Sequence, residues 1–275
     1  MSNGHMDQAA GLRSLMTPVL PQSRVIVAAH EAVTPDETLV HTMLAAAQAG
    51  HHLALLDGTR GVLGRLLNLP VRYELIHLLE GEKRFDEVMQ PAAALEHLQY
   101  LPACRGLRAL GQVQGGMRNL LQGFALMPNK PDFVVAYGGP DMIESLAELA
   151  DLAGEMVWRI TARPEVITAT YAQLKAVVRR YPSMQHRIWV HGLPDATAAD
   201  HLFANLAEAT QKFCGLNLHY LGFTRACPAS GRTRSGVPGD AIARLAEAMF
   251  RSDSEVWQAH QTLTPDSQNI AEIAL

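Results

Sequence analysis

The stretch that decides the fold is RVIVAAHEAVTPDETLVHTMLAAAQAGHHLALLDGT, residues 24–59. It predicts a strand, a loop, a helix over 36–50 that ends at Gly50, and a second strand. Many proteins hold a phosphate chain in such a frame. The loop at 30–37 contains no glycine, although a backbone that wraps around a phosphate needs glycine. The sequence therefore has the frame of a nucleotide site without the loop that such a site requires.

Short apolar runs alternate with helical stretches along the rest of the chain. Runs that are apolar on both faces, such as VIVAA, belong in a parallel sheet with helices on each side. The predicted fold class is α/β: a doubly wound, mainly parallel sheet with helices on both faces. We expect strands at 24–29, 52–57, 132–137, 155–160, 187–192 and 217–222, and further helices at 141–154, 169–182, 195–215 and 241–250.

The domain organisation is predicted to be simple. Residues 1–22 read as a short amphipathic helix followed by a linker, and residues 23–275 read as a single α/β domain. The segment 227–240 is rich in glycine, serine and proline, which favours a surface loop. The first six residues look like the remnant of a cloning site.

Composition excludes several classes of function. The 275 residues are 48% hydrophobic and 18% charged, with a formal net charge of −4, which indicates a globular protein with no basic face for nucleic acid. Cys104, Cys214 and Cys227 lie far apart, so we expect reduced thiols. No apolar run is long enough to span a membrane, and no secretory signal is present. The expected location is the cytoplasm.

Candidate catalytic and metal-binding residues are sparse. His30, His51, His52 and His191 are expected near strand ends on one edge of the sheet, with Glu31 as the only nearby acid. Their spacing fits no metal motif, so structural roles are favoured and no metal site is expected. No nucleophile motif occurs. The segment GLRALGQVQGG lacks the spacing of a dinucleotide fingerprint, and no clean strand is expected before it.

Several segments resemble one known family. DQAAGLRSL, at 7–15, resembles the N-terminal helix of FlhG/FleN proteins, the MinD/ParA-type P-loop ATPases that control flagellar number in bacteria. RVIVAA, LALLDG, DFVVAYGGP, RPEVITATYAQLK and LNLHYLG then follow the family's order. The resemblance covers roughly residues 7 to 225 and implies a MinD/ParA-like P-loop NTPase fold, with ATP and magnesium as the cofactors of the family.

The chain departs from the family at every nucleotide element. With Thr38 on the last position of the family's G-K-G-G-V-G-K-T loop, Glu37 replaces the phosphate-binding lysine and Ala32 replaces the lysine that reaches across the dimer. The D-A-D motif becomes Asp57, Gly58 and Thr59. The D-T-G-A-G aspartate falls on Ala136. The vestigial nucleotide-site positions are therefore Glu31, Ala32, Glu37, Thr38, Asp57, Thr59, Ala136 and Gly138.

These departures lead to one hypothesis and two alternatives. The hypothesis is a nucleotide-independent regulatory protein, a pseudo-ATPase with no cofactor, in which Asp36 or Thr34 simply caps the helix that follows the loop. One alternative is an active ATPase with an unorthodox site, for which Arg60 and Arg65 are the nearest cations. The other is a metal-dependent enzyme that uses the sheet-edge histidines.

The resemblance also implies a protein partner. In the family the N-terminal helix stimulates the GTPase FlhF, and Asp7, Gln8, Ala9, Leu12 and Arg13 match it. The partner expected is therefore FlhF or another flagellar component. A homodimer remains open, but ATP is not expected to gate it. The helix at 241–250 carries few cations, so a core-covering role is favoured over membrane contact.

Overall fold

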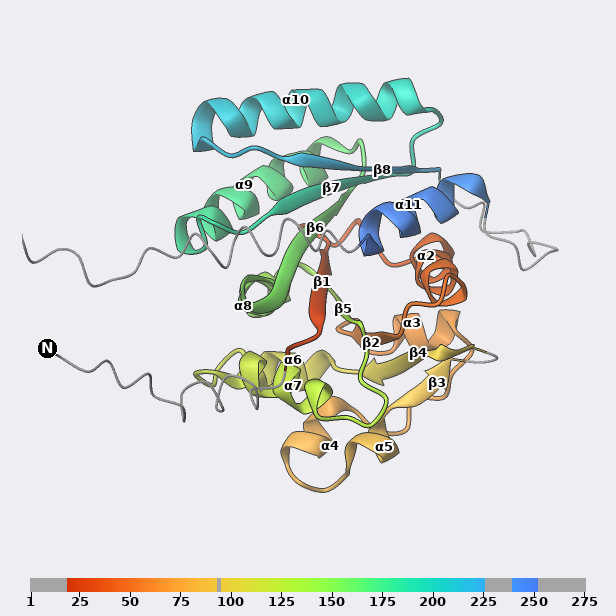
Figure 1. Cartoon of the computed structure of the whole chain (residues 1–275). Helices are drawn as coiled ribbons and strands as arrows, with labels where there is room; N and C mark the ends of the chain where they lie inside the picture. The colour runs from red at the N-terminus through yellow and green to blue at the C-terminus, as the bar shows by residue number, and fades with distance from the viewer. Residues whose placement is uncertain (1–18, 93–94, 226–238, 252–275) are drawn as a thin grey trace, which may run out of the picture.

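The computed structural model describes residues 19–92, 95–225 and 239–251. An eight-stranded sheet in the order β3-β4-β2-β5-β1-β6-β7-β8 forms its centre (Figure 1). Among the strand pairs of the described residues, only β3–β4 is antiparallel. The strands are β1 (Gln22–Val27), β2 (Leu53–Asp57), β3 (Gln90–Ala92), β4 (Leu95–Pro102), β5 (Phe133–Gly138), β6 (Gly154–Ile160), β7 (His186–His191) and β8 (His219–Thr224). The predicted doubly wound α/β fold is confirmed.

Helices cover both faces of the sheet. On one face α2 packs against α11, while α8 packs against β1 and β6 on the other, beside α7 and α9 (Figure 1). The helices are α2 (Glu37–Gln48), α3 (Val62–Leu66), α4 (Leu75–Leu79), α5 (Phe85–Val88), α6 (Cys104–Leu110), α7 (Gly116–Ala125), α8 (Ile143–Ala153), α9 (Pro164–Arg180), α10 (Ala196–Cys214) and α11 (Asp240–Phe250), with a 3-10 turn η1 (Pro140–Met142). The predicted N-terminal helix at 7–16 lies outside the described residues.

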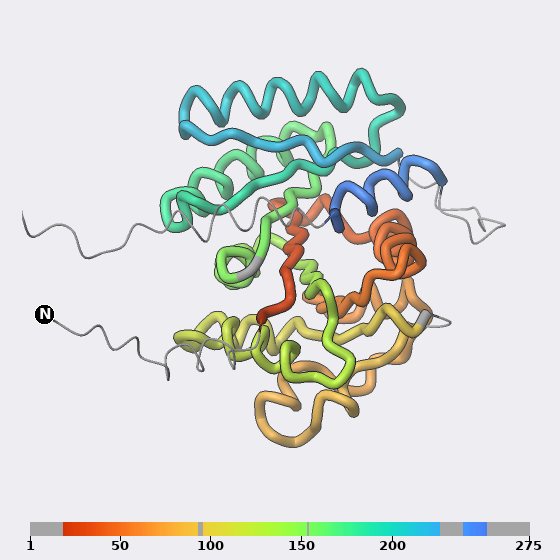
Figure 2. The backbone as a smooth tube through the Cα atoms, viewed as in Figure 1, coloured from red at the N-terminus to blue at the C-terminus, as the bar shows by residue number. Residues whose placement is uncertain are grey.

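The carboxyl ends of the parallel strands meet at one edge of the sheet. Strand β1 lies between β5 and β6, as the tube in Figure 2 shows. Every residue of β2 and β5 is buried, which is the pattern of a strand covered on both faces. The loops that follow β1, β2, β4, β5, β6 and β7 therefore gather at this edge, where α/β proteins place their sites.

Two strands were not predicted, and one prediction about them was wrong. Strand β4 was missed because its sequence, LEHLQYLP, interrupts the apolar run with Glu96, His97 and Gln99. A strand therefore does precede the segment 106–116, contrary to expectation, since β4 ends at Pro102 and α6 begins at Cys104. The spacing of the glycines in that segment still differs from a dinucleotide fingerprint.

Helix α11 is held as a core helix. Leu245, Met249 and Phe250 are buried in the main core. Arg24 Nε donates to the Met249 carbonyl at 2.8 Å and Arg187 Nη2 donates to the Ala248 carbonyl at 3.0 Å, so two guanidinium groups bind the last turn of the helix. The core-covering role is confirmed. Within the part of the chain that the structure describes, no helix is both long and apolar enough to cross a membrane.

Candidate functional site

The loop between β1 and α2 does not have the conformation of a phosphate-binding nest. A nest alternates right- and left-handed residues so that successive N–H groups converge on an anion. In the described residues, positive φ occurs at Arg60, Asn68 and glycines that all lie outside residues 28–36. Helix α2 instead begins with Asp36 as its N-cap, whose side chain accepts from Leu39 N. The expectation that this aspartate caps the helix is confirmed.

Side chains from the neighbouring strands hold the loop from within. The Tyr137 hydroxyl, at the end of β5, donates to the Val33 carbonyl at 3.1 Å. Arg159 Nη1, near the end of β6, donates to the Thr34 carbonyl at 2.7 Å. Two consecutive loop carbonyls are thus directed at the sheet, where protein donors satisfy them.

Asp36 is the centre of a charged cluster beneath the loop. Its Oδ1 lies 2.8 Å from Arg159 Nη2 and its Oδ2 lies 2.8 Å from His191 Nε2. The Arg159 side chain is 0% exposed, and its guanidinium carbon lies 5.1 Å from the centre of the Trp189 ring. Thr224 Oγ1 lies 3.1 Å from His191 Nδ1 and orients the imidazole. Asp36, Arg159 and His191, which we call the loop triad, bring three segments together.

The loop triad shifts the titration of its carboxylate. Burial acts to raise the pKa of Asp36, but the hydrogen bond from His191 and the positive charge of Arg159 outweigh it and lower the pKa to about 2. Burial raises the pKa of the neighbouring Tyr137 hydroxyl to about 12. Asp36 is therefore an anion at neutral pH, and its carboxylate pairs with the buried Arg159 guanidinium.

This shift predicts an acid-sensitive contribution to stability. Because the folded pKa of Asp36, about 2, lies below the unfolded value, its contribution is complete above pH ~4 and is lost as pH falls toward 2. The amount is about 2 kcal/mol. Urea unfolding at a series of pH values should show this slope in the wild type and lose it in Asp36→Asn. Asp195→Asn is the matched control, since Asp195 caps α10 and makes no ion pair with any residue that the structure describes; an equal loss of slope there would contradict the assignment.

The loop after β2 is built around Asp57, which is fully buried. Its Oδ1 accepts from the backbone N–H of Thr59 at 2.8 Å and from the Thr59 hydroxyl, while Oδ2 accepts from the Tyr100 hydroxyl at 2.8 Å. A Cβ on Gly58 would lie 2.6 Å from the Tyr137 carbonyl oxygen, so only glycine fits between Asp57 and Thr59. The Asp57 carboxylate therefore has a structural role: it links the loop after β2 to Tyr100 in β4.

The other vestigial nucleotide-site positions differ in their exposure to solvent. Glu31 and Glu37 are exposed, and Ala32 is half-buried. The buried positions Thr38, Ala136 and Gly138 are part of the packed interior. These residues frame the loop triad without forming a common polar site. The predicted partner-binding residues Asp7, Gln8, Ala9, Leu12 and Arg13 lie outside the described residues.

The predicted grouping of the histidines was wrong in part. His30 and His191 follow β1 and end β7 at the carboxyl edge, whereas His51 and His52 precede β2 and lie at the opposite edge. His52 N there binds Asp132 Oδ2, at 2.8 Å, just before β5. Among residues 19–92, 95–225 and 239–251, no group of three histidine, cysteine, aspartate or glutamate side chains is placed to hold a metal ion.

Sequence reasoning missed Arg159 and Tyr137, the two donors that hold the loop. Arg159 interrupts the apolar run MVWRI in β6, a strand that was correctly expected at 155–160. Because a fully buried arginine requires a partner, an arginine within an apolar strand indicates that an acid or another acceptor lies nearby in the fold. The sequence does not say which acid it meets.

Comparison with known proteins agrees with this fold. No protein-family model matches the chain. It is 24% identical over 186 residues to the antiactivator FleN of Pseudomonas aeruginosa, a match that covers 66% of each protein, just under two thirds of FleN. Among the similar solved structures is the MinD cell division protein of Aquifex aeolicus, with 12% identity, a TM-score of 0.59 and coverage of 82% of this chain and 95% of that one. Another is MinD with Mg-ADP from Pyrococcus horikoshii, with 14% identity, a TM-score of 0.60 and coverage of 84% of this chain and 97% of that one.

These similarities define a class. The fold is that of the MinD/ParA-type P-loop ATPases. In sequence the chain is similar to the antiactivator FleN, in agreement with the resemblance drawn from its motifs.

Proposed function

We propose that this chain is a nucleotide-independent MinD/FlhG-like regulator that acts through protein contacts in flagellar assembly or number control. The observation that carries the proposal is the loop triad. Asp36 already supplies the negative charge that Arg159 and His191 face. A phosphate group would have to compete with a carboxylate that belongs to the same chain.

Charge and backbone oppose a triphosphate in the loop. The carbonyls of Val33 and Thr34 are bonded to the sheet, and Glu37 presents a like charge where the family has a lysine. Each unit pair at 4 Å contributes from about 1 kcal/mol in water to about 4 at an effective dielectric of 20. Micromolar binding amounts to only about 8 kcal/mol. Reversing one such contact therefore removes a large share of any affinity.

Titration with nucleotide tests the proposal. We expect neither heat of binding nor a rise in melting temperature when Mg-ATP or Mg-ADP is added, because any ligand of the folded state stabilises it by mass action. Asp36→Gly is a useful comparison, since it removes the carboxylate that Arg159 and His191 face while the Val33 and Thr34 carbonyls keep their donors. Saturable binding of Mg-ATP to the wild-type protein would contradict nucleotide independence and would favour an ATPase with an unorthodox site.

A protein partner is the second part of the proposal. FleN is described as an antiactivator, and MinD of Aquifex aeolicus has been solved in complex with MinC. By this likeness, and by the match at residues 7–13, the partner is FlhF or another flagellar component.

Purified FlhF offers a direct assay for that partner. The full chain is expected to retain FlhF on a column, and a variant without residues 7–16 is expected to lose it while melting at the same temperature. Leu12→Asp tests the apolar side of the segment without a deletion. Equal retention by all three proteins would exclude the N-terminal segment as the contact with FlhF.

A further inference from the structure

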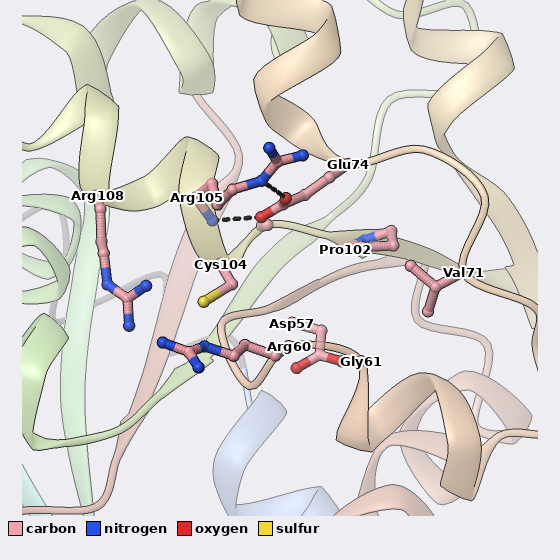
Figure 3. A pocket seen from close by; sticks show the side chains of 10 residues that line it. Asp57, Arg60, Gly61, Val71, Glu74, Pro102, Cys104, Arg105 and Arg108 are labelled. Carbon is pink, nitrogen blue, oxygen red and sulfur yellow. Dashed lines mark hydrogen bonds and ion pairs between the residues drawn. The ribbon is translucent and has the colours of Figure 1, made fainter.

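A separate pocket of about 380 Å³ opens beside the loop after β2, at the carboxyl ends of β2 and β4 (Figure 3). Val71, Pro102 and Ala103 form apolar parts of its wall, and Arg60, Arg105 and Arg108 supply cations. No residue of the loop between β1 and α2 lines it. Its volume falls within the range of small-molecule sites, about 300–1,000 Å³.

The acidic groups in the pocket are already satisfied. Asp57 accepts from Thr59 and Tyr100, as described above. The Glu74 carboxylate lies 2.6 Å from Arg105 Nε and also accepts from the Arg105 backbone N–H. Asp57 and Glu74 therefore form the fixed acidic part of the pocket, and Arg105 is bound to Glu74 at two points, its Nε and its backbone N–H.

Two arginines remain for a ligand. Arg108 pairs with Asp141, but both side chains are substantially exposed, at 37% and 58%, so this ion pair is weak and exchangeable. Arg60 has no hydrogen bond or ion pair with any residue in the described part of the chain. Its side chain extends past the Cys104 thiol toward Arg108 (Figure 3). The Arg60 guanidinium thus points toward that of Arg108 (Figure 3), and of these two groups Arg108 is the one that already has a carboxylate partner, Asp141.

The backbone at Arg60 also has an unusual conformation. Arg60 has a φ of 56°, a left-handed conformation that a long side chain adopts only at a cost in free energy. Gly61 follows with a φ of 83°, and a Cβ there would lie 3.0 Å from Val71. This turn presents the Arg60 side chain to the pocket. A glycine at position 60 would adopt the same turn without strain.

We propose that this pocket binds a compact phosphate monoester, with the dianionic phosphate between Arg60 and Arg108 and an apolar body against Val71 and Pro102. Two guanidinium forks match the charge and the oxygen geometry of a phosphate dianion. A single carboxylate could contact both groups, but it would bring only one negative charge against two positive charges. The site is distinct from the nucleotide loop of the family and does not depend on the regulatory role proposed above.

Phenyl phosphate is the probe that tests this site, because it carries a dianion and a small apolar ring. Melting temperature and titration calorimetry of the full chain are expected to show binding. Inorganic phosphate, which lacks the ring, should bind more weakly, and benzoate, which lacks the second charge, should bind least. Benzoate binding as tight as phenyl phosphate would contradict a phosphate site.

Arg60→Gly is the decisive variant. It should fold and melt at a higher temperature than the wild type without ligand, since glycine relieves the strained φ. Its Kd for phenyl phosphate should rise about tenfold or more, as expected when a charged hydrogen-bonding partner is lost. Asn68→Gly is the matched control, because Asn68 has the same φ of 56° and does not line the pocket. Unchanged binding in Arg60→Gly would overturn the proposal.

Mg-ATP added to the same assays separates this proposal from the regulatory one. Binding of phenyl phosphate with no response to Mg-ATP would support both. If no probe binds, the phosphate site is overturned and nucleotide independence is still supported. Binding of Mg-ATP that disappears in Arg60→Gly would support an anion site here and contradict nucleotide independence.

Discussion

Asp36→Ala is expected to lower the free energy of unfolding by about 3–5 kcal/mol, because it leaves a buried guanidinium without its counter-charge. The Arg159 side chain is 0% exposed and reaches Asp36 Oδ1 at 2.8 Å. The same substitution removes the N-cap of α2, which contributes about 1 kcal/mol of that loss. Urea unfolding monitored by circular dichroism measures the effect.

Two further variants divide this loss into its parts. Asp195→Ala removes an N-cap on α10 that pairs with no cation among the described residues, so a loss of only about 1 kcal/mol is expected. The double variant Asp36→Ala with Arg159→Met removes both charges and should recover part of the stability lost in the single variant. If Asp36→Ala lowers the free energy of unfolding no more than Asp195→Ala does, the ion pair between Asp36 and Arg159 does not stabilise the fold. The closed conformation of the loop would then need another cause.

Asp57→Ala is expected to cost about 2–4 kcal/mol, because three donors lose a buried acceptor at once. They are the Thr59 N–H, the Thr59 hydroxyl and the Tyr100 hydroxyl. Burial and the nearby Asp57 charge raise the pKa of Tyr100 far above its usual range, so the phenol remains protonated and donating. Chemical denaturation of the variant and the wild type gives the difference directly.

Tyr100→Phe is the companion variant for Asp57. It removes one of the three hydrogen bonds and keeps the ring, so about 1–2 kcal/mol should be lost. A much smaller effect of Asp57→Ala than of Tyr100→Phe would show that the carboxylate is under electrostatic stress in the fold, as a group kept for chemistry is. The structure predicts the opposite order.

The strands of the sheet were predictable because their pattern is local. VIV in β1 and FVVA in β5 are apolar on both faces, and the sheet buries both faces. Asp36 was identified as a cap for a related reason, since a cap acts within three residues of its own position. By contrast, β4 alternates polar with apolar residues near the rim of the sheet, and the rule that found the central strands does not apply to it.

The loop triad was not predictable because its members meet only through the fold. Arg159 reads as one polar residue in a buried strand, and His191 as the last residue of another. Their shared acid depends on the strand order β1-β6-β7, which brings the three chain segments together. Periodicity in the sequence gives the elements, but it does not give the order in which they lie side by side.

The bond between Arg159 and the loop after β1 also affects the time course of folding during synthesis. Thr34 and the arginine that bonds to it are 125 residues apart. At a translation rate of 5–20 residues per second, the first segment emerges roughly 6–25 s before its partner. During that interval β1 also lacks β6, one of its two neighbours in the sheet. The nascent amino-terminal part therefore emerges with an unpaired strand edge. At this stage of synthesis the exposed edge of β1 is open to aggregation and is a binding site for a chaperone.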